Sequence, residues 1–99
     1  MHTLPMDYLR KANVAEGGHF FDNSAMDAFQ SRIESRVAFV NTATQTAFFV
    51  TSECMSPGSP RLYKVRRFEE NCRIKTADFE LYADFEAAEE SAQRFAVAH

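Results

Sequence analysis

The sequence predicts a single α+β domain, because helical and extended patterns occupy separate parts of the chain. The N-terminal third and the C-terminal end show apolar residues at helical spacing, whereas the middle shows short β-branched and aromatic runs. Consecutive extended runs with short links favour an antiparallel sheet. We expect three or four strands, with two N-terminal helices and one C-terminal helix packed on one face. The 99 residues provide one core, so residues 1–99 form one domain.

Two helices are expected in the N-terminal third. The first begins at Pro5, which suits a first helical position, and it ends at the Gly17-Gly18 pair. The second begins between Asp22 and Ser24, and either residue can serve as its N-cap. Its apolar stripe continues to Ile33.

The extended runs lie at residues 36–41, 46–53 and 61–69. Residues 73–82 offer one or two further short strands, and the pattern leaves open whether 79–82 is a strand or a loop.

The C-terminal helix follows Asp84, which can cap it. Its buried stripe is expected to consist of Phe85, Ala88, Ala92 and Phe95.

Composition and charge narrow the class of protein. The net charge of −3 argues against a general nucleic-acid coat protein, which would be basic. The sequence contains no apolar run of membrane-spanning length and no signal-peptide pattern, so we expect a soluble, cytoplasmic protein. Cys54 and Cys72 fall at opposite ends of one expected strand, too far apart to bridge, and we expect two free thiols.

The residue pattern gives little support for catalysis. His19 lies between a glycine pair and two phenylalanines, and the other histidines are at the chain ends, so no metal site is predicted. The glycines lack the spacing of a phosphate-binding loop. His19 with Asp22 and Cys54 or Cys72 would be needed for a nucleophilic triad, and no local signature supports one. We therefore expect no enzymatic activity and no cofactor, with His19 as a possible functional loop residue.

Charges are unevenly distributed along the chain. Residues 61–75 are mainly basic, whereas residues 78–90 contain six acids and no base. Strand alternation separates two side-chain sets. We expect the first set to lie under the helices: Phe48, Val50, Tyr63 and Val65. We expect the second set on an open sheet face: Phe49, Lys64, Arg66 and Phe68.

An open face of bases and aromatics has four interpretations. It can bind single-stranded nucleic acid by stacking and phosphate contact. It can bind an acidic protein surface, or remain solvated under long side chains. Its aromatics can also form the seam of a homodimer.

Four motifs resemble a family of small uncharacterised phage and prophage proteins. They are Gly18-His19-Phe20-Phe21, Met26 to Arg32, Phe49 to Glu53 and Tyr63 to Arg66. The resemblance implies an accessory gene carried by phage, a class that includes inhibitors of host defence such as anti-CRISPR proteins. It transfers no enzymatic activity.

The leading hypothesis is a non-enzymatic phage protein that inhibits a host defence complex by occupying its surface, for example an anti-CRISPR protein. Its partner would be a host protein or ribonucleoprotein complex in the bacterial cytoplasm. A small single-stranded nucleic-acid-binding regulator is the alternative. The expected partner-binding residues are Phe49, Lys64, Arg66, Arg67, Phe68, Glu86, Glu89 and Glu90.

Overall fold

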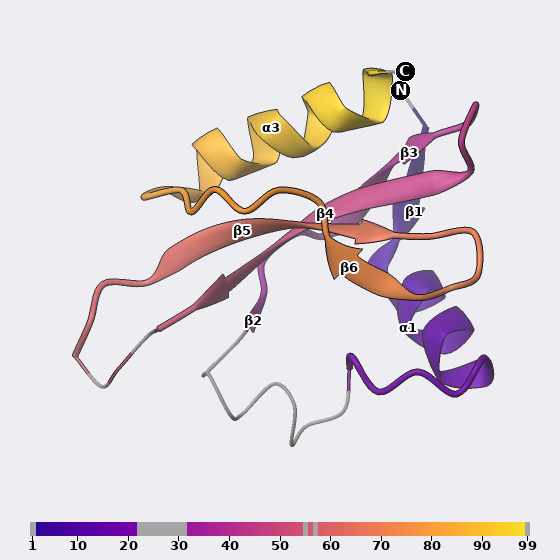
Figure 1. The fold of residues 1–99 in the computed structure, drawn as a ribbon, viewed down its shortest axis with the longest axis horizontal. Helices are drawn as coiled ribbons and strands as arrows, with labels where there is room; N and C mark the ends of the chain where they lie inside the picture. Colours follow the sequence, from indigo (N-terminus) through magenta and orange to yellow (C-terminus); the bar gives the residue numbers. More distant parts are fainter. Residues whose placement is uncertain (1, 22–31, 55, 57, 99) are drawn as a thin grey trace.

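The computed structural model describes residues 2–21, 32–54, 56 and 58–98, and it shows an α+β fold around one antiparallel sheet (Figure 1). The strands are β1 (Thr3–Pro5), β2 (Arg32–Ile33), β3 (Val37–Asn41), β4 (Thr46–Glu53), β5 (Leu62–Phe68) and β6 (Ile74–Thr76). The helices are α1 (Met6–Ala15) and α3 (Phe85–Val97). The α+β class and the antiparallel sheet are confirmed.

The sheet is larger than the three or four strands predicted. Its strand order is β1-β3-β4-β5-β6, and β2 pairs with β4 off this path. The unpredicted strands β1 and β2 are three and two residues long, too short to carry an alternating pattern. The strands at the two ends of the path, β1 and β6, have three residues each.

The prediction that all helices pack on one face is wrong, because α1 and α3 cover opposite faces of the sheet (Figure 1). On one face, the α3 alanines pack against Phe48, Val50 and Val65. On the other, Leu9 of α1 packs in a cluster with Phe49. The described residues therefore form three layers with two apolar clusters between them.

Strand β4 lies at the centre of this arrangement. Every residue from Ala47 to Ser52 is buried, because each face of β4 is covered. Strand β5 runs antiparallel beside it, with Val50 opposite Val65 and Phe49 opposite Arg66. Side chains that alternate along these strands therefore enter different clusters.

The glycine pair ends α1, as predicted. Gly17 has φ +79°, the left-handed conformation that glycine adopts without a Cβ clash. The Gly18 amide donates to the Asn13 carbonyl at 2.8 Å, and the Gly17 amide donates to the Val14 carbonyl at 3.0 Å. These two bonds form a Schellman motif, which satisfies carbonyls at the helix end.

The predicted second helix falls mainly on residues 22–31, which lie outside the described residues. The prediction that this helix continues to Ile33 is wrong, because Ile33 belongs to β2 and lies opposite Thr51 of β4. Pairing with the central strand, rather than helical spacing, decides the conformation there.

Helix α3 follows the prediction closely. The Asp84 carboxylate accepts a hydrogen bond from the Ala87 amide at 2.8 Å and caps the helix. Ala88 and Ala92 are fully buried, and the flanking phenylalanines pack against the same cluster. Beyond the helix, the Ala98 carbonyl accepts from Asn41 Nδ2 at 2.6 Å.

Candidate interaction surfaces

The predicted open face of the sheet does not exist as a binding platform. Phe49 has no exposed surface and Phe68 is 7 % exposed, so neither ring can stack on a base or anchor a partner. Both rings belong to the cluster that contains Leu9. The apolar surface assigned to a possible dimer seam is covered by α1 of the same chain.

Lys64 and Arg66 lie on this covered face, where they are mostly buried. Each approaches the Glu53 carboxylate at 3.9 Å. Arg66 also donates from Nε to Thr51 Oγ1 at 3.1 Å and from Nη1 to Thr76 Oγ1 at 3.0 Å. Burial lowers the pKa of Arg66, and the Glu53 charge partly offsets this by raising it. These contacts give Arg66 a structural role.

Arg67 lies on the α3 side of the sheet, because it pairs with Phe48 rather than Phe49. Its guanidinium contacts the Glu69 carboxylate at 2.9 Å, and Lys75 contacts the other oxygen of Glu69 at 3.2 Å. The expected basic surface is therefore divided between two faces and is partly neutralised by Glu53 and Glu69.

The Gly-His-Phe-Phe segment has a packing role. The Phe20 ring lies edge-on to Phe49 with centroids 6.0 Å apart, and the Arg66 guanidinium lies 5.5 Å from its centroid. Phe21 contacts Phe20 in the same edge-on manner, and Arg10 lies 5.7 Å from the Phe21 centroid. Both rings thus hold the segment against the sheet.

His19 is exposed beside these rings. It lines a shallow hollow with neighbours from its own segment and from α1, chiefly Arg10, Val14 and Phe21. In the described part of the chain, no group of three or more His, Cys, Asp or Glu residues could hold a metal ion. Cys54 and Cys72 are free thiols, the first directly after β4 and the second in the β5–β6 turn.

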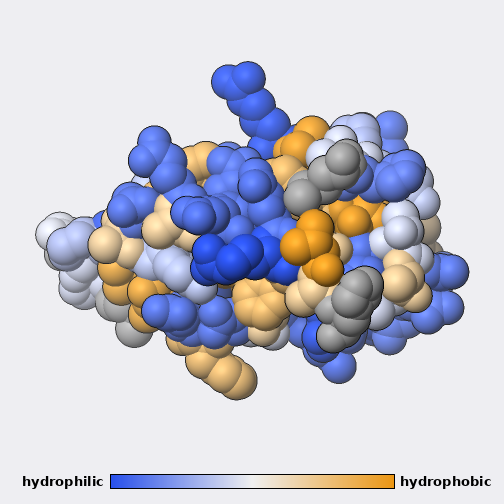
Figure 2. Space-filling model, turned by 90° about the horizontal axis from the view of Figure 1, so that it is seen from above, coloured by the Kyte–Doolittle hydropathy of each residue, from blue (hydrophilic) through white to orange (hydrophobic). Residues whose placement is uncertain are grey.

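The acidic residues of α3 are accessible. Glu86 and Glu90 are exposed and Glu89 is half-buried. Glu90 forms an exposed ion pair with Arg94 at 3.7 Å, an interaction that contributes little to stability. Figure 2 looks onto the α3 side, where hydrophilic side chains are interspersed with apolar ones along the length of the molecule.

The loop of residues 78–81, which precedes α3 in the chain, presents an exposed apolar side chain. Phe79 is 93 % exposed, the largest exposure among the large apolar residues described. The loop is fixed at both sides: the Ala77 amide donates to the Val65 carbonyl at 3.0 Å. On the other side, Tyr82 and Tyr63 exchange two backbone hydrogen bonds of 2.9 Å. The possible strand at 79–82 is thus a loop that ends in one bridge.

Side chains hold the same loop from within. Asp78 Oδ1 accepts from the Glu80 amide at 3.0 Å, and Asp78 Oδ2 accepts from the Tyr82 hydroxyl at 2.9 Å. Burial is the main cause of the raised pKa of Tyr82. Phe79 therefore projects from a fixed loop.

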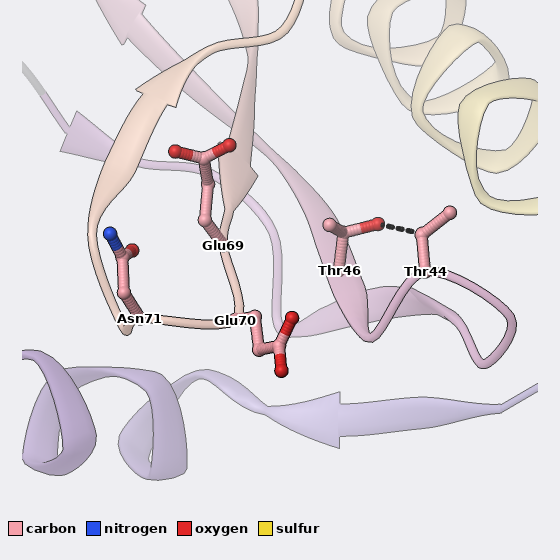
Figure 3. Close-up of a pocket in the computed structure, with 5 residues that line it drawn as sticks. All are labelled: Thr44, Thr46, Glu69, Glu70 and Asn71. Atoms are coloured by element: carbon pink, nitrogen blue, oxygen red, sulfur yellow. Dashed lines mark hydrogen bonds between the residues drawn. The ribbon is translucent and has the colours of Figure 1, made fainter.

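A hollow lies at the end of the sheet where two hairpin turns come together. Its rim, shown in Figure 3, contains Thr44 of the β3–β4 turn, Thr46 at the start of β4, and three residues of the β5–β6 turn, Glu69, Glu70 and Asn71. Thr44 and Thr46 share a hydrogen bond of 2.7 Å between their hydroxyls. An adjoining part, with a volume of about 350 Å³, has mainly apolar walls that include Leu4, Tyr8 and Phe68.

A protein-family model matches residues 6–93, and its description is a family of unknown function, DUF7447. The chain belongs to the DUF7447 family. No curated protein and no solved structure matches it. In the described part of this DUF7447 chain, no helix has the length and apolar character needed to cross a membrane.

Sequence reasoning missed Phe79 and the hollow. No local signal in the sequence sets Phe79 apart, because Phe85 likewise stands between two acids, Asp84 and Glu86, and yet packs against the core. The hollow also had no local signal, because its walls come from β1, α1 and two turns that are distant in the sequence.

Proposed function

We propose that this DUF7447 chain is a non-enzymatic binding protein that inhibits a partner by occupying a basic surface. The observation that carries the proposal is Phe79, a 93 % exposed ring on a loop fixed at both sides. A free protein that already holds its anchor in place loses little conformational entropy when it binds. Aromatic anchors of this kind contribute a large share of binding energy at interfaces.

The negative charge of the loop and of α3 indicates that the partner surface is basic. The loop carries Asp78 and Glu80, and the following chain carries four more acids before and along α3: Asp84, Glu86, Glu89 and Glu90. Such a surface complements a partner with an apolar pocket bordered by Lys and Arg. It would also repel nucleic acid, and the aromatics needed by the alternative nucleic-acid function are buried.

The resemblance to phage proteins suggests the class of partner. A host defence complex that reads a nucleic-acid backbone has basic grooves, and an acidic protein can occupy them. We therefore propose a phage-encoded inhibitor acting in the host cytoplasm, with an anti-CRISPR protein as the most concrete form.

The proposal is tested by pull-down from host lysate with the tagged chain, with and without nuclease. We expect the wild-type chain to recover a defence-complex subunit in both samples. Phe79→Ala should reduce its affinity for that subunit at least about ten-fold, as for an interface anchor. Because the ring is exposed, the melting temperature should not change.

The matched control is Val14→Ala, which truncates another exposed apolar side chain, on α1. It should bind as the wild type does. Charge reversal of Glu86, Glu89 and Glu90 to Lys should also abolish binding. Equal recovery by wild type, Phe79→Ala and the triple variant would contradict the proposal, and recovery only without nuclease would favour nucleic acid.

A further inference from the structure

The hollow between the two turns has the features of a ligand site distinct from the Phe79 surface. Its lining includes apolar side chains of the sheet, the half-buried Val40 and the buried Ala47 and Phe68. Leu4 and Tyr8 form the wall on the β1–α1 side. A concave apolar site with a few polar groups at its rim is typical of small-ligand recognition.

Both turns that form the rim are held in place. Asn41 Oδ1 accepts from the Ala43 and Thr44 amides at 3.0 and 3.2 Å, which fixes the β3–β4 turn. In the β5–β6 turn, the Cys72 amide donates to the Glu69 carbonyl at 2.8 Å. The site is therefore preformed.

Each turn also places a side-chain-bearing residue in the left-handed region. Gln45 has φ 56° and Cys72 has φ 65°, and they are the only such non-glycine residues in the described part of the chain. Both line the hollow. Glycine would adopt either conformation with less strain, and such strain clusters at functional sites.

The charge of the hollow selects the ligand. Glu69 is neutralised by Arg67 and Lys75. Among the described residues, Glu70 has no ion pair, and Figure 3 shows its carboxylate directed toward the space between the turn and the β1–α1 segment. The other described side chains that line the hollow are uncharged. Its one unneutralised charge is therefore negative.

We propose that this hollow binds a compact apolar group that carries an ammonium group. The apolar part lies against Leu4, Tyr8 and Val40, and the cation lies beside Glu70. This site and its ligand are independent of the Phe79 surface and of any inhibitory function.

The test is a titration of the ¹⁵N-labelled chain with 2-phenylethylamine, followed by amide shifts. We expect saturable shifts confined to the two turns and β1–α1, with a dissociation constant on the order of 1 mM. 3-Phenylpropionate, which replaces the amine with a carboxylate, should not bind. Glu70→Gln should weaken 2-phenylethylamine binding about two- to five-fold, the range of an exposed ion pair.

Two matched control variants separate the effect of the Glu70 charge from the effect of the apolar wall. Glu16→Gln removes an exposed carboxylate at the end of α1 and should leave the affinity unchanged. Tyr8→Ala, which shortens an exposed wall residue, should weaken binding, whereas Val14→Ala should not. Scattered shifts, equal binding of the carboxylate probe, or an unchanged affinity in Glu70→Gln would overturn the proposal.

A peptide arm identifies the source of the ligand. Acetyl-Gly-Phe-Lys-amide carries the same chemistry on a polypeptide. Tighter binding of the peptide than of 2-phenylethylamine would assign the hollow to a partner segment, and tighter binding of the amine would assign it to a small molecule.

Discussion

At the scale of single residues, glycine is required at position 18 by the side chain of Asn13. A Cβ at Gly18 would lie 2.5 Å from Asn13 Cγ, far inside van der Waals contact. Asn13 cannot easily turn away, because it is 2 % exposed and its Nδ2 donates to the Cys72 carbonyl at 2.7 Å. The glycine pair thus has two different roles: Gly17 supplies the left-handed φ and Gly18 supplies space.

We expect Gly18→Ala to lower the free energy of unfolding by about 1–3 kcal/mol, the usual range for overpacking. Urea denaturation of the single variants and of Asn13→Ala/Gly18→Ala provides the measurement. Because removing the Asn13 amide opens the space, the double variant should lose less stability than the sum of the single variants. Strictly additive losses would show that the contact is not the cause.

The sequence predicted that α1 ends at the glycine pair, because a helix end is a local event. It could not predict the contact of Gly18 with Asn13, which depends on a bond to Cys72, 59 residues away. The same limit applies to His19, whose exposure depends on how the flanking rings pack.

At the scale of elements, Arg66 joins three strands. Its guanidinium, carried on β5, bonds to Thr51 of β4 and Thr76 of β6, and it approaches Glu53. Such a forked set of hydrogen bonds depends on the planar geometry of arginine. The strand that carries Arg66 was predicted from its alternating pattern. Arg66 itself was assigned to an exposed surface, because the sequence did not indicate that α1 packs on that face of the sheet.

We expect Arg66→Ala to lower the free energy of unfolding by about 1–3 kcal/mol, because it removes the donor to the Thr51 and Thr76 hydroxyls and leaves Glu53 with Lys64 as its remaining basic neighbour. Arg66→Lys should recover only part of this loss. Arg73→Ala, at an exposed position in the β5–β6 turn, should change stability by less than about 0.5 kcal/mol. Thermal unfolding of the three variants distinguishes this structural role from a binding role, which would leave the melting temperature unchanged.

At the scale of the whole molecule, the three-layer arrangement could have been found in one short run of sequence. Residues 47–50, Ala-Phe-Phe-Val, are all apolar, so the side chains that point to each face of the strand are apolar. This pattern is typical of a strand that is covered on both faces. The alternation of basic and apolar residues within 61–69 favoured a sheet with only one covered face. The reason is that β5 places Lys64 and Arg66 on the α1 side, where they looked like residues of a solvated face. Of the expected partner-binding residues on α3, Glu86 and Glu90 are exposed and Glu89 is half-buried.

The three layers predict that Phe48 and Phe49 are equally important for stability. Each substitution to Ala should lower the free energy of unfolding by about 3–5 kcal/mol, as for other buried phenylalanines. A tolerated Phe49→Ala beside a damaging Phe48→Ala would show that the α1 side of the sheet is open. Phe49→Leu, which keeps most of the volume, is the control and should cost less, as measured by urea denaturation.

Because the outermost strands are short, the edges of the sheet pair poorly with other molecules at high protein concentration. β1 includes Pro5, which has no amide hydrogen to donate, and β6 has an exposed charged residue, Lys75, at its middle. A three-residue edge with these side chains is a poor template for an incoming strand from a neighbouring molecule. The two ends of the sheet are thereby protected against fibril growth, even though the central strand is among the most aggregation-prone kinds of segment when unfolded.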